Sequence, residues 1–198
     1  MEIVLASKSP RRKKLLKELG IKFKVHESGC SEDKTCKSPP KTALMHAKAK
    51  AENVAVHYKN AIVIGLDTIG AYRGQIIGKP KNKKDALGML RFLNGSRHKV
   101  ITGICIINTK TGKTKAGISE TFVTFAKMTE AEMNLYINSG EGRDKAAGYA
   151  IQGLGAVFVE KIEGDYFNVV GLPICKLSKM LKEMGVDLLK IREKNRQT

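Results

Sequence analysis

The 198-residue sequence predicts an α/β protein built on a mixed sheet. Strand-like and helix-like segments are mixed along the chain, several neighbouring strands are joined as hairpins, and 42% of the residues are hydrophobic. This irregular order argues against a regular repeat of strand, helix and strand. Because no internal repeat or linker is visible, we expect residues 1–198 to form one compact domain with a cleft and a sizeable core.

The first elements are a short buried strand over residues 3–6 and a helix that begins after Ser9. Ser9 suits the N-cap, the proline after it suits the first helical position, and Gly20 suits the end of the helix. Residues 21–28 alternate between apolar and polar, which is typical of a half-buried strand. Residues 29–41 contain turn formers and acids, and we expect a loop there.

A second helix is predicted where apolar side chains repeat at helical spacing. Lys48 falls inside the apolar stripe, which consists of Leu44, Ala47, Ala51, Val54, Ala55 and Tyr58. The β-rich run 61–72 then folds back through an Arg-Gly turn into residues 75–80. A short amphipathic helix is expected over residues 83–94.

The second half of the chain begins with a predicted hairpin of residues 98–108 and 116–127. Thr129 and Glu132 form a capping-box signature at the start of another helix. A glycine-rich segment follows over residues 140–155.

The last part of the chain contains two apolar segments, 156–162 and 166–171, on either side of a turn. We expect a final helix from Pro173 to about Met184. Residues 190–198 are basic and polar, and we expect them to form a flexible tail.

The first turn of the opening helix carries the wrong charge for its position. Arg11 and Arg12 follow the cap, lysines surround them, and no acid lies between them. Each cation at the positive end of a helix costs about 0.3 to 1 kcal/mol. Since helix N-termini bind anions and arginine forms bidentate contacts with phosphate, a polyphosphate ligand would offset this cost.

Asp67 interrupts an otherwise apolar strand, where an unpaired carboxylate is costly to bury. A buried carboxylate is suited to act as a base, and a divalent metal would also explain its burial. We favour this functional interpretation over an acid bonded to backbone amides at a strand end. Glu32 is a candidate second carboxylate, although its spacing alone is that of a solvated loop acid.

Several further polar side chains would suit a phosphate site. Taken alone, Lys48 is explained by a stem that covers the core with its ammonium in water, and Lys79 by an ordinary turn. Together with Ser7, Ser9 and the two arginines they supply many donors for phosphate oxygens. In the glycine-rich segment, Gln152 could both donate and accept hydrogen bonds, as base recognition requires.

The composition limits the alternatives. A net charge of +17 attracts nucleic acids, membranes and anionic metabolites alike, but the sequence has no tryptophan and no recognisable nucleic-acid module. No apolar stretch is long enough for a membrane span and no secretory signal is visible, so we expect a cytoplasmic protein. We interpret the cysteines as reduced, with Cys105 and Cys175 buried, and the four histidines as surface or capping residues.

In their order along the chain, these segments resemble the Maf family of nucleoside triphosphate pyrophosphatases. The matching motifs run from Leu5 to about Leu181 and are "LASKSPRR", "GLDTIG", "GKP", "LNGSRHKVITG", "RDKAAGYAIQG" and "VVGLP". The resemblance implies an elongated, twisted mixed sheet flanked by helices, with two lobes around a cleft. It also implies hydrolysis of dTTP or UTP to the monophosphate and pyrophosphate with a divalent cation, Mg²⁺, Mn²⁺ or Co²⁺.

The resemblance also assigns roles to individual positions. Asp67 matches the proton acceptor and Glu32 its acidic partner, and both would bind the metal. The phosphate-binding positions are matched by Ser7, Ser9, Arg12, Lys48 and Lys79, and the substrate-specificity positions by Arg11, Thr68 and Gln152. Gly70, Ala147 and Ala150 depart from the family pattern, which usually has a larger apolar residue at the first position and glycine at the other two.

Two other interpretations stay open at this point. A basic nucleic-acid-binding protein would use the opening arginines to contact backbone phosphates without a metal. A related pyrophosphatase could act on modified nucleotides instead of the common ones. We also consider a homodimer as the state of the protein.

Overall fold

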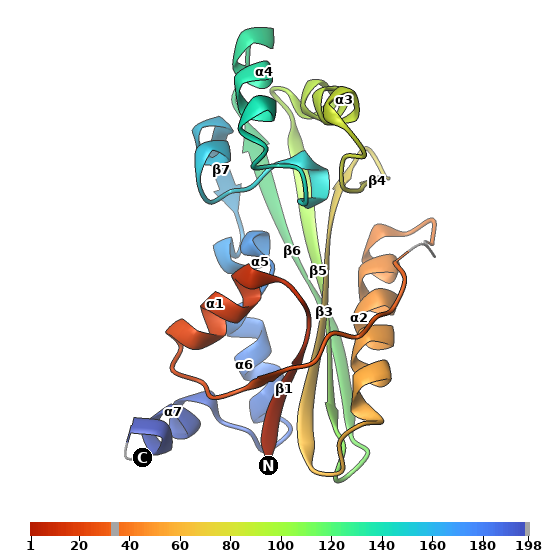
Figure 1. Ribbon diagram of the computed structural model, residues 1–198, viewed down its shortest axis with the longest axis vertical. Helices are drawn as coiled ribbons and strands as arrows, with labels where there is room; N and C mark the ends of the chain where they lie inside the picture. The colour runs from red at the N-terminus through yellow and green to blue at the C-terminus, as the bar shows by residue number, and fades with distance from the viewer. Residues whose placement is uncertain (33–35, 197–198) are drawn as a thin grey trace.

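A long mixed sheet runs through the molecule from one end to the other, as a computed structural model shows (Figure 1). The structure describes residues 1–32 and 36–196. The strands are β1 Glu2–Ala6, β2 Lys24–Val25, β3 Ala61–Tyr72, β4 Gln75–Ile77, β5 Arg97–Asn108, β6 Thr114–Phe125 and β7 Val159–Glu163. Three of them, β3, β5 and β6, are long enough to join the two ends of the molecule.

The strand order is β2-β1-β3-β5-β6-β7, and β4 pairs with one end of β3. The pairs of β1 with β2 and β3 are parallel, whereas β5 pairs antiparallel with both β3 and β6. The sequence-based prediction of an α/β protein on a mixed sheet is confirmed. In this register Asp67 lies opposite Gly103, in the middle of the sheet.

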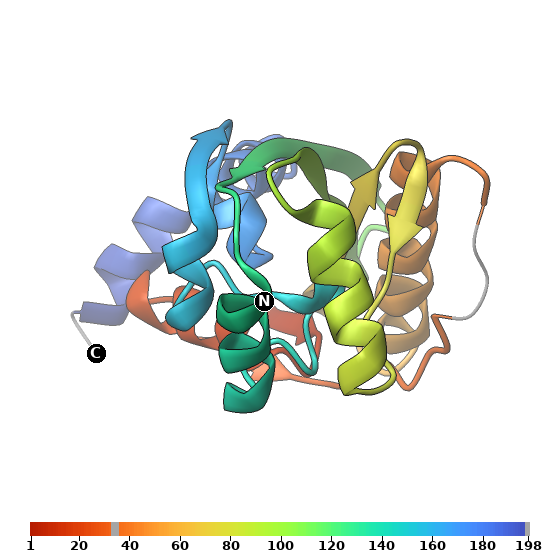
Figure 2. The same cartoon turned by 90° about the horizontal axis from the view of Figure 1, so that it is seen from above.

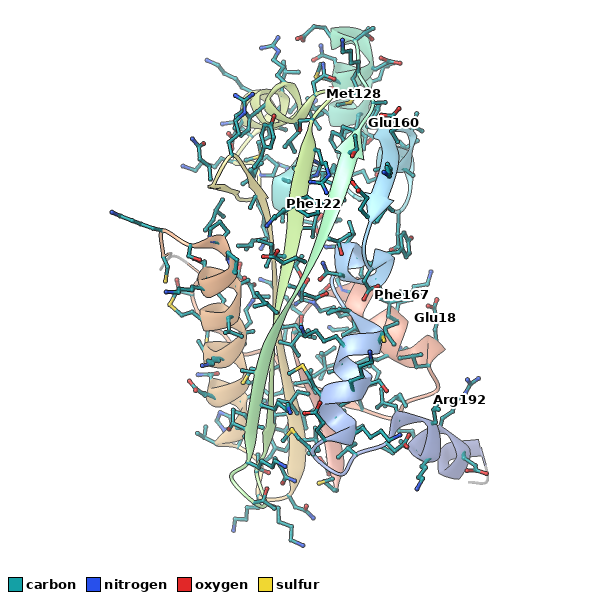
Figure 3. All side chains as sticks on the ribbon, turned by 180° about the vertical axis from the view of Figure 1, so that it is seen from behind. Glu18, Phe122, Met128, Glu160, Phe167 and Arg192 are labelled. Atoms are coloured by element: carbon teal, nitrogen blue, oxygen red, sulfur yellow. The ribbon has the colours of Figure 1, made fainter. Side chains whose placement is uncertain are left out.

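Helices cover the sheet on both faces. They are α1 Pro10–Glu18, α2 Pro39–Ala55, α3 Lys83–Leu93, α4 Glu130–Ser139, α5 Tyr166–Val170, α6 Ile174–Lys182 and α7 Leu188–Arg196, with short 3₁₀ turns η1 Ala146–Gly148 and η2 Leu154–Phe158. Seen from behind, α2 and α6 flank the lower half of the sheet (Figure 3). Seen from above, α3 and α4 lie side by side (Figure 2), where Arg91 forms a bidentate ion pair with Glu130.

Alternate residues of β3 enter two different cores, because successive side chains of a strand point to opposite faces. Ile62, Ile64 and Leu66 join the large cluster under α1 and α6. Ala61 and Val63 join a smaller cluster under α2. Asp67 continues the second series, so its side chain lies on the α2 side of the sheet.

Helix α2 packs closely against the sheet because glycines of the strands face alanines of the helix. A Cβ atom at Gly65 would overlap the carbonyl oxygen of Ala47, and one at Gly103 would overlap that of Ala43. Bare glycine is therefore required at both strand positions. This close contact fixes the rotation of α2 about its own axis and decides which of its side chains face Asp67.

Three local expectations differ from the structure. The strand expected over residues 21–28 is reduced to the two exposed residues of β2, an edge strand that pairs only with β1 in the described structure. The basic end of the chain forms α7 as far as Arg196, and the expected tail at residues 197–198 lies outside the described residues. Cys105 is buried as predicted, but Cys175 is exposed on α6.

Within the described ranges, every helix falls short of the length and apolar character that crossing a bilayer requires.

Candidate active site

A cavity of about 1160 Å³ opens where the start of α1 faces the middle of β3. The loop before α2 and the segment 143–152 form its other walls. Its lining includes Ser7, Ser9, Arg11, Arg12, Glu32, Asp67, Thr68, Lys79 and Gln152, which are all the predicted site residues except Lys48. The structure thus brings the cationic start of the chain and the acid of the central strand to one cavity.

Asp67 is buried but fully paired. Its side chain is 7% exposed, Lys50 Nζ donates to Oδ1 at 2.6 Å, and His46 Nδ1 lies 3.0 Å from Oδ2. Both partners come from α2, one turn apart, so they reach the same carboxylate. The cost of burying Asp67 is therefore offset by two specific contacts, which also fix the orientation of its oxygens.

Glu32 shares a lysine with Asp67. Lys50 Nζ donates to Glu32 Oε1 at 2.6 Å, and Lys79 Nζ donates to Oε2 at 3.4 Å. Burial alone would raise the pKa of Glu32, but the hydrogen bonds and charges of Lys50 and Lys79 outweigh it and lower this pKa to about 2. Glu32 is therefore ionised at neutral pH, and it shares Lys50 with Asp67.

The prediction that Lys48 lies in the apolar stripe of α2 is wrong, because Lys48 is exposed and is not among the residues that line the cavity. The buried face of α2 is rotated toward Thr42, Ala43, His46 and Lys50. At about 100° per residue, a lysine two positions further along the helix lies on almost the opposite side. Lys50, and not Lys48, is therefore the lysine of α2 that lines the cavity.

Sequence reasoning also missed His46. The prediction that the four histidines are surface or capping residues is wrong for His46, which is buried against Asp67, and for His98, which is also buried. The signal that could have found it is the i, i+4 spacing of His46 and Lys50 on a helix otherwise rich in alanine. That spacing becomes informative only once the position of the acid is known.

Arg12 is held by the protein itself. Its Nε donates to Gly171 O at 2.8 Å, its Nη1 to Ser7 Oγ at 2.9 Å and to Leu66 O at 3.0 Å, and its Nη2 to Thr68 Oγ1 at 2.8 Å. Burial lowers the pKa of Arg12 to about 10, and the charge of nearby Asp67 opposes this shift. The guanidinium thus connects α1 to β3 and to the end of α5.

Arg11 has a different environment from Arg12. It is half-buried, and it lines the cavity beside the start of α1. Burial lowers its pKa, and the charge of Asp144 across the cavity opposes this. Ser9 caps the helix by accepting a hydrogen bond from the backbone N–H of Arg12 at 3.5 Å. The anion-binding end of α1 therefore points into the cavity.

The proposed specificity residues lie at different depths. Thr68 Oγ1 also bonds to Thr102 Oγ1 at 2.9 Å, which ties it to the sheet, whereas Gln152 is exposed at the cavity rim. Tyr149, which the prediction did not name, lines the cavity and bonds to the buried His98 at 2.8 Å. Burial lowers the pKa of His98 to about 4, so this histidine is neutral at physiological pH.

The candidate donors for a metal are the carboxylates of Asp67 and Glu32. No group of three or more His, Cys, Asp or Glu residues suited to a metal ion occurs in the described parts of the chain. Mg²⁺ is often bound by one or two carboxylates together with substrate phosphates and water. Asp67 and Glu32, joined by Lys50, fit a site of that kind, in which the nucleotide would supply the remaining oxygens.

Comparisons with known proteins identify the family of this chain. The sequence model of the family described as "Maf-like protein" matches residues 2–184. The chain is 51% identical over 191 residues to a dTTP/UTP pyrophosphatase of Thermoanaerobacter sp. (strain X514), covering 96% of this chain and all of that protein.

Two further relatives carry the same name. One, from Dictyoglomus thermophilum, is 44% identical over 190 residues, with 95% of this chain and 98% of the relative covered. The other, from Methanosarcina barkeri, is 43% identical over 189 residues, with 94% and 96% covered. The chain therefore belongs to the Maf family.

Proposed function

We propose that this protein hydrolyses dTTP and UTP to the nucleoside monophosphate and pyrophosphate. The relatives that match it over nearly their whole length bear the name of this activity. The observation that carries the proposal is that Asp67, held by His46 and Lys50, opens into the same cavity as the cationic start of α1. A carboxylate base beside a polyphosphate-binding surface is what this reaction requires.

In this proposal Asp67 accepts a proton from a water molecule that attacks the α-phosphorus, and pyrophosphate leaves. The contacts from His46 and Lys50 keep the carboxylate in one orientation before the substrate arrives. Glu32 faces the same ammonium and orients the water from the other side. Such positioning, together with charge stabilisation, supplies most of the catalysis in phosphoryl transfer.

The phosphate chain lies along the cationic wall of the cavity. Arg11 and Lys79 provide charged donors that line the cavity, and the N-terminal amides of α1 provide neutral ones. Arg12 contributes by fixing the helix start and by its positive charge close to Asp67. A divalent cation bound by Asp67 and Glu32 would polarise the phosphate oxygens and neutralise their charge.

The base would lie at the other end of the cavity, near Thr68 and Gln152. Gln152 is exposed at the rim, so its amide is available to both donors and acceptors on a pyrimidine ring. We also propose that the two ends of the sheet act as the two lobes of one domain around this cavity. A homodimer and a cytoplasmic location stay predictions.

The test is release of pyrophosphate from the common and modified nucleoside triphosphates, with and without Mg²⁺, Mn²⁺ or Co²⁺. We expect metal-dependent turnover that is highest with dTTP and UTP. Turnover only with modified bases would favour the alternative substrate class. No turnover, combined with oligonucleotide binding that weakens steeply with salt, would replace the proposal with a nucleic-acid-binding function.

A further inference from the structure

Ala147, in η1, has a backbone conformation that side chains rarely adopt. Its φ is +61° and its ψ is 13°, which is the left-handed region normally occupied by glycine. The residue is 1% exposed, so its methyl group lies in the core. A strained alanine of this kind persists only where the surrounding structure holds it in place.

Gly70 of β3 provides the space that this methyl group occupies. A Cβ atom at Gly70 would lie 2.8 Å from the Cβ of Ala147, closer than such atoms approach in real proteins. The opposing atom is a methyl group fixed to the backbone, so it cannot rotate away as a long side chain would. The two positions therefore hold one methyl group between them, and a second could enter only if the backbone moved.

Gly70 lines the cavity, and Ala147 lies in the core directly behind another part of its wall. Gly70 lines the cavity three residues after Asp67 on the same strand, and Ala147 lies in the segment that carries Tyr149 and Gln152. The N–H of Ala147 donates to Gly78 O at 2.9 Å, immediately before Lys79. The contact between Ala147 and Gly70 thus joins the segment at the proposed base end to β3, the strand that carries Asp67.

We propose that Gly70 and Ala147 are a matched pair of positioning residues, which sets where the segment 143–152 lies over the cavity and so determines recognition of the nucleoside. This inference rests on the proposed function. The segment can approach β3 closely enough for its alanine to fit because the strand has no side chain there.

The expected effect is on binding of the nucleoside and not on the phosphate end. In Gly70→Ala the added methyl group pushes η1 away from β3 and moves Tyr149 and Gln152 with it. Asp67, His46 and Lys50 lie on the long elements β3 and α2, whereas η1 is a three-residue turn and is the part we expect to move. KM for dTTP should therefore rise while kcat changes little.

The experiment is a double-mutant cycle of Gly70→Ala, Ala147→Gly and the two together. We expect Gly70→Ala to raise KM for dTTP and the Kd of dTMP about tenfold, while the Kd of pyrophosphate changes less than about twofold. Ala147→Gly removes the methyl group and the strain, and should stay within about threefold of the wild type. The double variant should recover to the same range, since one position again has room for the other's side chain.

Gly88→Ala is the matched control. It adds the same methyl group on α3, where nothing lies within 4 Å, and should leave both affinities unchanged. If Gly70→Ala does not fold, the double variant decides: a folded, active double variant supports the pair, and one that also fails to fold overturns it. Unchanged dTMP binding in Gly70→Ala, or equal loss of dTMP and pyrophosphate binding, would also overturn it.

Failure of this inference is distinguishable from failure of the proposed function. An active wild-type enzyme whose two single effects simply add in the double variant would retain the function and reject the pair. A wild-type protein that neither binds dTMP nor releases pyrophosphate would reject both.

Discussion

Helices α4 and α1 begin in the same way but carry opposite charges. Thr129 caps α4, Glu132 completes a capping box, and both acids of its first turn are stabilised by the helix dipole. Ser9 caps α1, yet its first turn holds two arginines and no acid. The start of α4 follows the rules for local stability, and the start of α1 violates them.

The difference lies in what each helix start faces. The start of α4 contributes no residue to the cavity lining, while that of α1 forms a wall of the cavity. Arg12 of α1 donates hydrogen bonds to buried oxygens of the protein, and these bonds compensate for its unfavourable position at the helix start. Arg11 instead faces the cavity. The unfavourable positive charge in the first turn of α1 therefore indicated the position of the cavity. Of the two arginines there, Arg12 is bonded to the protein itself and Arg11 faces the cavity.

The largest expected effect comes from removing the acid that α1 faces. Asp67→Asn keeps the size of the side chain but removes the proposed proton acceptor. We expect turnover to fall on the order of a hundredfold or more. Steady-state pyrophosphate release measures this, with circular dichroism to confirm the fold. Near-normal turnover would remove Asp67 from the mechanism.

A smaller effect is expected at the arginine with structural partners. Arg12→Lys retains the charge but cannot reach Gly171 O, Leu66 O and Thr68 together, so buried acceptors lose their donor. We expect the free energy of unfolding to fall by about 2 kcal/mol. Urea denaturation measures it. A variant as stable as the wild type would show that these contacts do not stabilise α1.

The matched change at the neighbouring arginine should affect binding and not stability. We expect Arg11→Gln to raise KM for dTTP about tenfold, because one charged contact with the phosphate chain is lost. Its unfolding midpoint should stay close to that of the wild type. The opposite result, unchanged KM with a clear loss of stability, would reverse the roles inferred for the two arginines.

At α4 the cap should contribute to stability alone. Thr129→Ala removes the side chain that accepts the N–H of Glu132. We expect a loss of about 1 kcal/mol in the free energy of unfolding, and kcat and KM equal to those of the wild type. Lower activity in a fully folded Thr129→Ala protein would show that this end of the molecule takes part in the reaction.

The smallest effect concerns acid pH. The pKa of Glu32 is lowered from 4.5 to about 2 in the folded protein. Its contribution to stability is therefore fully present above pH 4.5 and is lost as the pH falls toward 2. Glu32→Gln should flatten the stability curve within that window, as measured by denaturation at a series of pH values. The difference will be small because the carboxylate is partly exposed.

The sequence by itself determined the local elements and the set of candidate residues. Caps at Ser9 and Thr129, the apolar period of the helices and the β-rich apolar run of β3 are all visible among near neighbours in the sequence. The lone acid at position 67 was visible because it interrupts an apolar run. All of the predicted site residues except Lys48 line the cavity.

Only the tertiary structure decided which side chains meet. Gly65 and Gly103 let α2 approach the sheet, and that contact fixed its rotation so that His46 and Lys50, not Lys48, reach Asp67. The partners of Arg12 come from residues up to 159 positions away. Helical periodicity specifies a stripe on a helix, but the direction in which the stripe faces is set by packing against distant residues, and no local pattern contains that information.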